Sequence, residues 1–296
     1  MKVATSAAID KLVVALHACQ PLRVWSLIVT FYGDAVVPRG GEIWLGTISE
    51  LMQAMEIDDR AVRAAMSRLA RDGWVERYKI GRRSFYGLSA AGHDEFAAAS
   101  ERIYTRPETQ EGGEWQIVLL GEGNGRQSQR ERLLKAGFGQ LSANMLIGTI
   151  ATAIPGPAAG GATLVFRSTL ERGSEEDLIG RAFDLAPLAV RYHAFMERYK
   201  PLWTALDDGD LLAGIDAMIA RTLLIHDYRR IVLRDPFLPK RYLPEDWAGH
   251  EARKLCAGIY KVLQKPSDAW LCSAGQSRDG DLPKPVSGYF QRFAEV

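Results

Sequence analysis

Eight Lys and Arg residues lie between Asp58 and Ser89, a segment that holds only four acidic residues. The whole chain has a formal net charge of +1, so this positive charge is a local feature of one surface. Within the segment, KIGRRSFYGLS (79–89) places three cations around Gly81, and aromatic residues follow directly. Guanidinium groups match guanine edges and phosphate oxygens, so this clustering is typical of a surface that binds nucleic acid.

A helix is predicted in IDDRAVRAAMSRLARDGWV (57–75), with Asp58 or Asp59 as its cap and Gly73 at its end. At 100° per residue, its larger apolar side chains share one face: Val62, Met66 and Leu69. The opposite face carries polar side chains: Arg60, Arg63, Ser67 and Arg71. The apolar face would pack on other helices, and the arginine face would point outward.

The residues after this helix alternate and turn at Gly81, which predicts a hairpin with Arg82 at its tip. Together, helix and hairpin supply the residues from which we expect DNA contacts: Arg60, Arg63, Ser67, Arg68, Arg71, Lys79, Arg82 and Arg83. A solvated helix face and an ordinary basic turn are the alternative interpretation of either feature alone.

Two further helices and a short strand are expected before this segment. A buried helix is predicted over 22–32, closed by Gly33-Asp34, and a strand over 42–45. Thr47 is predicted to cap the second helix, with Glu50 completing a capping box. Three helices, a short strand and a basic hairpin, in this order, predict a winged helix-turn-helix, whose third helix enters a major groove.

The rest of the chain divides into a polar Pro/Gly linker (105–113), a segment of strands and one helix, and a helical segment from about Ser174. We therefore predict an α+β multidomain fold. A winged helix-turn-helix DNA-binding domain would span 1–104, a small ferredoxin-like domain 113–172, and a mainly α-helical domain 173–296.

Basic and aromatic residues also gather in LLIHDYRRIVLRDPFLP (223–239) and WAGHEAR (247–253). One interpretation is an ion-pair network that holds helices together. The other is a pocket that binds an anionic small molecule, with aromatic side chains over its apolar part. Its candidate residues are His226, Asp227, Arg230, Arg234, Trp247, His250 and Arg253.

The sequence predicts no catalytic residues, no metal site and no cofactor. It contains no Ser/His/Asp order, no close carboxylate pair and no HExxH. The cysteines, Cys19, Cys256 and Cys272, lie far apart without CxxC spacing, which fits a reducing cytoplasm better than a disulfide framework or a zinc site. No stretch approaches the length of a membrane span.

Five motifs resemble the PaaX family, the transcriptional repressors of phenylacetic acid degradation, and the similarity runs from about residue 21 to 293. They are FYGDAVVPRGGEIWLGTI, VRAAMSRLARDGWVERYKIGRRSFYGLS, LLIHDYRRIVLRDPFLP, LPEDWAGHEARKLC and SGYFQRF. The resemblance implies a winged-helix domain, a middle domain related to the Cas2 fold, and a C-terminal helical domain. It also implies a homodimer that binds double-stranded operator DNA, blocks transcription of catabolic genes, and is released by phenylacetyl-CoA.

Cas2-type nucleases hold a metal with an aspartate at the end of the first strand. Here Gly121 and Glu122 stand at that place, so we expect a scaffold or dimerisation role without nuclease activity. The alternative function is an enzyme that acts on CoA thioesters or nucleic acid and carries an accessory winged helix. That alternative predicts turnover of the substrate.

Overall fold

In the computed structural model, residues 3–105, 113–150, 152–156 and 163–295 are described. The contacts divide the chain into two compact units. Unit 1 contains Met1–Arg106, Ala194–Arg229 and Glu251–Val296, and unit 2 contains Pro107–His193 and Arg230–His250. The fold is of mixed α+β class, as predicted, and the three-domain division stays a prediction. Within the described residues, no helix is long and apolar enough to cross a membrane.

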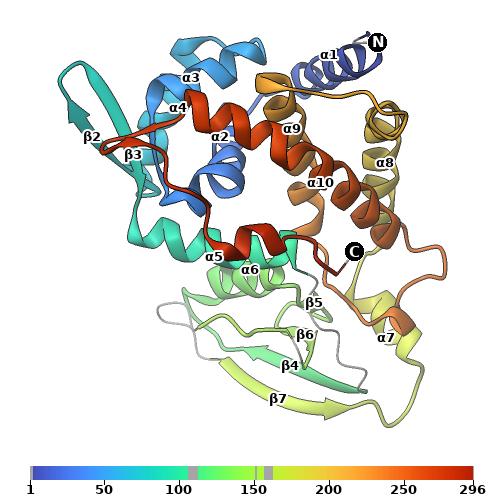
Figure 1. Cartoon of the computed structure of the whole chain (residues 1–296). Helices are drawn as coiled ribbons and strands as arrows, with labels where there is room; N and C mark the ends of the chain where they lie inside the picture. The colour runs from blue at the N-terminus through green and yellow to red at the C-terminus, as the bar shows by residue number, and fades with distance from the viewer. Residues whose placement is uncertain (1–2, 106–112, 151, 157–162, 296) are drawn as a thin grey trace. The chain divides into compact units, whose positions relative to one another are not determined.

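The N-terminal part of unit 1 is a set of helices with one small sheet (Figure 1). Its helices are α1 (Val3–Ala18), α2 (Val24–Phe31), α3 (Leu45–Ala54), α4 (Asp59–Arg71) and α5 (Ala90–Tyr104). Its strands are β1 (Glu42–Trp44), β2 (Val75–Ile80) and β3 (Arg83–Leu88). They form an antiparallel sheet of order β1-β3-β2, in which β2 and β3 make the predicted hairpin.

Helix α4 has the two predicted faces. Val62 and Met66 are fully buried, and Leu69 is nearly so. Asp58 caps the helix by accepting a hydrogen bond from the backbone N–H of Ala61 at 2.9 Å. Burying this apolar face anchors α4 and leaves its arginine face exposed.

Two predictions about local structure are wrong. Thr47 does not cap α3, because the helix begins at Leu45 without a side-chain cap. The Thr47 hydroxyl is buried instead and donates to the carbonyl oxygen of Ala274 at 2.8 Å, so a tertiary contact replaces the expected local one. The chain also does not leave the helix at Gly33-Asp34, since α2 continues as a π-helical turn, η1 (Tyr32–Val36).

The remaining helices lie in the C-terminal half: α7 (Glu175–Ala182), α8 (Ala186–Asp207), α9 (Gly214–Val232) and α10 (Ala248–Ala274). A short 3₁₀ turn, η3 (Lys240–Tyr242), lies between α9 and α10, and another, η4 (Ser287–Gln291), lies near the C-terminus. A third, η2 (Val37–Arg39), follows η1. After α10 the chain forms a small hairpin, β8 (Gln276–Ser277) and β9 (Gly280–Asp281). Helices α8, α9 and α10 each run from one unit into the other along the sequence.

Unit 2 is built on a four-stranded antiparallel sheet of order β5-β6-β4-β7. Its strands are β4 (Glu114–Leu120), β5 (Gly139–Gln140), β6 (Met145–Thr149) and β7 (Thr163–Thr169), and α6 (Arg126–Ala136) connects β4 to β5. Trp115 and Ile147 pack with α7, while Val118 and Leu146 pack with Leu133 of α6. The predicted linker lies almost wholly outside the described residues.

A charged cluster is buried in the middle of unit 1. The Asp34 carboxylate accepts hydrogen bonds from Arg221 Nε at 2.7 Å and from Arg292 Nη1 at 3.0 Å. The hydroxyls of Tyr104 and Tyr260 also donate to it, at 2.6 and 3.0 Å. The Asp34 and Arg221 side chains are 1% and 0% exposed, so the pair is removed from water and must be compensated internally.

Further partners complete the cluster. Arg221 Nη1 donates to Ser267 Oγ and to Asp268 Oδ1, each at 3.0 Å. Arg39 forms an ion pair with the same Asp268 carboxylate at 3.3 Å. Burial alone would raise the pKa of Asp34, but the charges of Arg221 and Arg292 and the hydrogen bonds to the carboxylate lower it below its usual value. The carboxylate therefore stays ionised inside the fold.

Replacing this carboxylate tests its contribution to stability. Asp34→Asn leaves two buried guanidinium groups short of a counter-charge, so we expect a loss of about 3–5 kcal/mol in the free energy of unfolding. Urea denaturation of the full chain measures it. Exposed Asp207 is the matched control, and Asp207→Asn should change this value by less than about 0.5 kcal/mol.

The same pair predicts a pH dependence. The pKa of Asp34 is lower in the folded chain than in the unfolded one, so its stabilising effect is complete above about pH 4, the ordinary Asp range. The effect is lost as pH falls through the lowered pKa. The stability difference between the wild type and Asp34→Asn should therefore shrink in acid; a constant difference down to pH 2 would contradict the burial of an ionised pair.

Candidate functional site

The predicted DNA-binding residues of α4 are all exposed: Arg60, Arg63, Ser67, Arg68 and Arg71. Three of the arginines have acidic neighbours on α4 or directly after it. Arg63 donates to Asp59 at 2.7 Å, Arg68 donates to Asp72 at 3.4 Å, and Arg71 lies 3.9 Å from Asp72. Surface pairs of this kind contribute little to stability, so the guanidinium groups can exchange these partners for phosphates at low cost.

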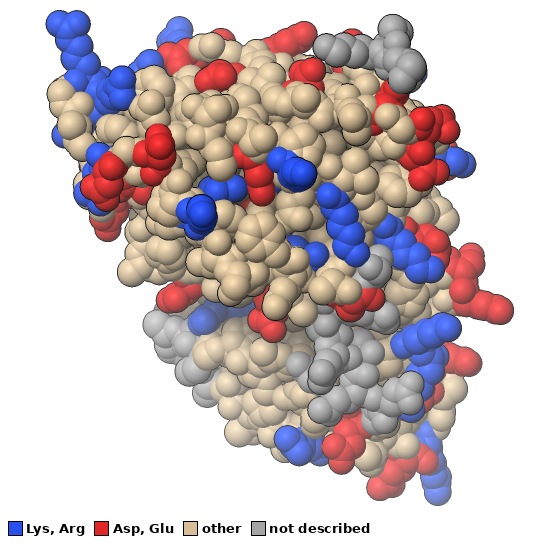
Figure 2. Space-filling view, in the orientation of Figure 1, with Lys and Arg blue, Asp and Glu red and all other residues tan. Residues whose placement is uncertain are grey.

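The hairpin residues Lys79, Arg82 and Arg83 are exposed as well. Gly81 takes a left-handed φ of 57° in the two-residue connection between β2 and β3, and a Cβ there would meet no atom within 4 Å. The glycine is therefore required by the backbone turn and not by packing. Lys and Arg side chains gather at the tip of this hairpin, at the upper left of the molecule in Figure 2.

The helix and the hairpin meet at one hollow of about 320 Å³. Arg63 from α4 and Arg82 and Arg83 from the hairpin tip line it, together with the start of α3. Three of the eight predicted DNA-binding residues are thus brought together, and the other five lie along α4 and β2 outside the hollow. A concave surface with three guanidinium groups fits an anionic ligand such as a nucleic-acid backbone.

Asp59 pairs with both Arg63 and Ser49. Its carboxylate accepts from Ser49 Oγ at 2.6 Å as well as from Arg63 Nε at 2.7 Å, and these two hydrogen bonds lower the pKa of Asp59. Ser49 belongs to α3, so the contact also joins α3 to α4. From the sequence, Asp59 is only a possible helix cap, because its contact with Ser49, ten residues earlier, arises from the packing of α3 against α4.

The β8–β9 hairpin braces the small sheet of unit 1 and was not predicted. Arg278 forms an ion pair with Glu42 at 2.6 Å, and its guanidinium lies 4.1 Å from the ring centroid of Tyr78. Gln276 accepts a hydrogen bond from Arg83 at 2.7 Å. Figure 1 shows this C-terminal hairpin beside β2 and β3. Arg83 is therefore held by protein contacts, which also include the Trp44 ring at 5.1 Å.

Three of the predicted effector residues lie in unit 1. His226 is buried and lies 3.0 Å from the Thr30 hydroxyl. Asp227 accepts hydrogen bonds from Arg198 at 2.7 Å and Tyr199 at 3.1 Å. Arg253 donates to the carbonyl oxygens of Ile103 and Tyr104 and pairs with Glu295. These contacts hold segments of unit 1 together, as the ion-pair interpretation of the sequence expects.

The other four predicted effector residues lie in unit 2: Arg230, Arg234, Trp247 and His250. Trp247 is buried and packs edge-on against Tyr192, with ring centroids 5.8 Å apart. The Tyr192 hydroxyl in turn donates to the buried Asp235 at 2.7 Å. Arg230 and Arg234 are exposed. The assignment of all seven residues to an effector site stays a prediction.

Comparison with known proteins gives two family matches. Residues 23–92 match the family described as PaaX-like protein, and residues 183–273 match the PaaX-like protein C-terminal domain. The chain is also 34% identical over 287 residues to the transcriptional repressor PaaX of Escherichia coli (strain K12), covering 92% of this chain and 90% of that protein. The chain belongs to the PaaX family. The resemblance noted from the five sequence motifs is thereby confirmed.

Among solved structures, the chain is similar to the uncharacterized protein Rv0674 from Mycobacterium tuberculosis, with a TM-score of 0.48 and 18% identity. The similarity covers 76% of this chain and 90% of that one. The first match of the PaaX family includes α2 to β3, and hence all eight predicted DNA-binding residues.

Removing the brace tests its effect on the hairpin. Arg278→Ala deletes an ion pair and a cation–π contact, which together stabilise the packing of the β8–β9 hairpin on the sheet by about 1–2 kcal/mol. We expect amide hydrogens of β2 and β3 to exchange with solvent roughly 5–30-fold faster, as hydrogen-exchange mass spectrometry would show. Lys284→Ala, at an exposed position near the hairpin, should leave exchange unchanged. Equal exchange in the two variants would show that the brace does not hold the sheet.

Proposed function

We propose that this member of the PaaX family is a transcriptional repressor that binds double-stranded operator DNA through α4 and the β2–β3 hairpin. The observation that carries the proposal is the exposed arginine face of α4 together with Arg63, Arg82 and Arg83 around one hollow. The order of α3, a short turn, α4 and a two-stranded hairpin supports a winged helix-turn-helix architecture. The name of the Escherichia coli relative, transcriptional repressor PaaX, supports the regulatory role.

In this proposal the two parts of the surface differ in what they contact. Helix α4 enters the major groove, where Arg63 reaches base edges and Arg60, Arg68 and Arg71 reach phosphates. The hairpin lies on the backbone, where Arg82 at the tip contacts phosphate. Base contacts specify the operator and phosphate contacts position the protein on it.

We further propose that the protein acts as a homodimer through unit 2. Strand β7 is an edge strand of the sheet, and three consecutive apolar side chains on it are exposed: Leu164 by 60%, Val165 by 47% and Phe166 by 49%. An apolar edge strand favours pairing with a second copy. The strand order β5-β6-β4-β7 supports the ferredoxin-like, Cas2-related fold expected from the resemblance.

From the resemblance, we propose that phenylacetyl-CoA is the effector and that the regulated genes are those of phenylacetate catabolism. The protein would act in the cytoplasm. Thioester binding would favour a state of the dimer that cannot engage two half-sites of the operator at once. The thioester then releases DNA only to the extent that it binds this state of the dimer more tightly than the DNA-bound state.

The base-reading role of Arg63 has a direct test. Arg63→Ala should weaken operator binding by about 1–3 kcal/mol and reduce the difference between operator and non-operator DNA, because a bidentate base contact is lost. Fluorescence anisotropy with both duplexes measures this. Arg172→Ala is the control, since Arg172 is exposed and outside the interface. An unchanged preference for the operator would remove Arg63 from the base contacts.

The hairpin tip should behave differently. Arg82→Ala removes one phosphate contact, so binding to all sequences should weaken alike, and the slope of log K against log salt should fall by about one unit. The measurement is the same titration repeated between 50 and 200 mM salt, a range over which such contacts respond strongly. A variant that keeps both the affinity and the slope would show that the tip does not lie on DNA.

Release by effector tests the regulatory part. With protein near half-saturation on labelled operator DNA, we expect phenylacetyl-CoA to lower the anisotropy, and free phenylacetate and free CoA to leave it nearly unchanged. If all three leave the DNA bound, the effector proposal is wrong while DNA binding stands. Product formed from the thioester would instead support the enzyme alternative.

A further inference from the structure

A hollow of about 320 Å³ lies in unit 2, at the β5 edge of the four-stranded sheet. Its walls come from the end of α6, from β5, from the segment between α7 and α8, and from residues that follow α9. All of these residues belong to unit 2. The volume is at the lower end of the roughly 300–1,000 Å³ typical of small-molecule sites.

The buried side chains of the lining are apolar. Phe138, Phe183 and Leu188 are buried, and Leu185 and Pro236 also line the hollow. Phe138 belongs to the apolar cluster under α6 and Phe183 to the one under α7, so both rings are fixed by the core of the unit. A wall of two aromatic rings and aliphatic side chains suits a flat apolar group.

Two glycines allow the aromatic rings to lie directly on the sheet. A Cβ on Gly139 would come within 2.6 Å of the Ala182 carbonyl oxygen and 2.8 Å of the Phe183 ring. A Cβ on Gly148 would come within 2.8 Å of the Phe138 ring. Any larger residue at either position would displace a ring from the wall. Glycine at both positions therefore leaves room for the two rings that line the hollow.

The mouth of the hollow is charged. Arg191 on α8 and Arg234 after α9 line it, and both side chains are exposed. Asp184 is the single carboxylate of the lining, so the mouth carries a net positive charge. An apolar base with cations at the mouth matches a ligand that has an apolar acyl or aryl group at one end and anionic groups at the other.

We propose that this hollow is the effector site, in which the acyl group of a CoA thioester lies against Phe138 and Phe183 and Arg191 and Arg234 bind its phosphates. The inference rests on the proposed function. It places the whole effector site in unit 2, whereas three of the seven residues predicted from the sequence lie in unit 1. Of the seven residues predicted from the sequence, Arg234 alone lines this hollow.

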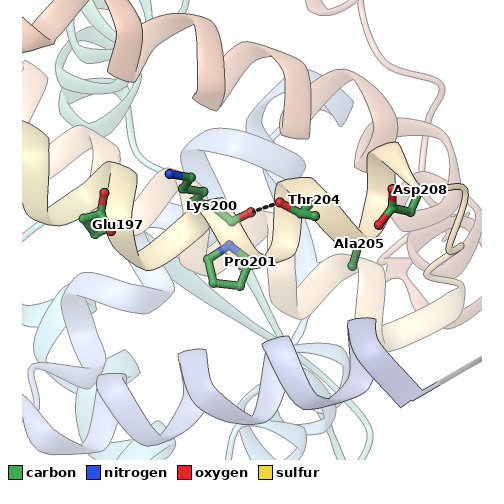
Figure 3. A pocket seen from close by; sticks show the side chains of 6 residues that line it. All are labelled: Glu197, Lys200, Pro201, Thr204, Ala205 and Asp208. Atoms are coloured by element: carbon green, nitrogen blue, oxygen red, sulfur yellow. Dashed lines mark hydrogen bonds between the residues drawn. The ribbon is translucent and has the colours of Figure 1, made fainter.

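A larger hollow on α8 fits this ligand less well. Its volume is about 430 Å³, and Figure 3 shows its six lining residues along α8 and directly after it. Glu197 and Asp208 face the same surface as Lys200, so carboxylates outnumber cations, and no aromatic side chain lines it. An anionic thioester would be repelled there.

The proposed site is also connected to unit 1 by the chain itself. Pro187, Leu188 and Arg191 are near the start of α8, and Arg234 follows the end of α9. Both helices continue along the sequence into unit 1, which carries α4 and the β2–β3 hairpin. A ligand that holds these helix ends can therefore bias the DNA-binding unit without touching it.

Isothermal titration calorimetry of the full chain without DNA tests the site with phenylacetyl-CoA, phenylacetate and CoA. Arg191→Ala removes a cation at the mouth, and we expect the thioester to bind about 10-fold more weakly, as for one lost charge-assisted hydrogen bond. Leu134→Trp narrows the hollow from the 41%-exposed Leu134 position and should weaken thioester binding at least as much. Arg181→Ala is the matched control, because Arg181 is exposed in unit 2 but does not line the hollow.

Operator affinity of the same variants, measured by anisotropy without ligand, separates the two proposals. We expect it to equal that of the wild type. If the thioester binds the wild type, Arg191→Ala and Leu134→Trp equally, the effector site lies elsewhere and the repressor function stands. If none of the three ligands binds the wild type, the site does not take this class of ligand. If the wild type does not bind operator DNA, the proposed function is wrong, whatever the calorimetry shows.

Discussion

The buried contact of Asp34 with Arg221 and Arg292 is the interaction on which unit 1 depends. It joins three parts of the chain that lie 187 and 258 residues apart, namely η1 after α2, helix α9 and the C-terminal tail. Full burial makes the contact obligatory, because each charge would be costly without the others. Tyr104, Tyr260 and Asp268 satisfy the remaining hydrogen-bonding groups. The contact therefore fixes the C-terminal helices on the N-terminal ones within a single compact unit.

This arrangement has a consequence for function. The C-terminal segments of unit 1 pack directly on the elements that carry the surface proposed to bind DNA. Thr47 of α3 donates to Ala274, and Arg278 of the β8–β9 hairpin pairs with Glu42 of β1. A change at α9 or α10 can thus reach α3 and the hairpin through specific contacts. The proposed release from DNA would require a connection of this kind, and these hydrogen bonds and ion pairs are the contacts available for it.

Local features were predictable from the sequence, and long-range ones were not. The two faces of α4, its Asp58 cap and the turn at Gly81 follow from periodicity and backbone preferences within about ten residues. The partners of Asp34 could not be predicted, because nothing in FYGDAVV or MIARTLLI indicates that Asp34 and Arg221 meet. Thr47 shows the same limit, since its hydroxyl has a distant acceptor in place of the local N–H expected of a cap. The short strands β5, β8 and β9 have two residues each, too few for any pattern. Five motifs sufficed to indicate the family, but the hollow in unit 2 is formed by segments whose side chains only the fold brings together.

The central claim is that α4 and the β2–β3 hairpin face the DNA. Site-specific photo-crosslinking tests it most directly, with p-benzoylphenylalanine placed at Arg82 in one variant and at Leu211 in another. Leu211 is 81% exposed and lies outside α4 and the hairpin. We predict that irradiation of the complex with operator DNA links the probe at position 82 to the duplex and leaves the probe at position 211 unlinked. Linkage from position 211 without linkage from position 82 would contradict the account.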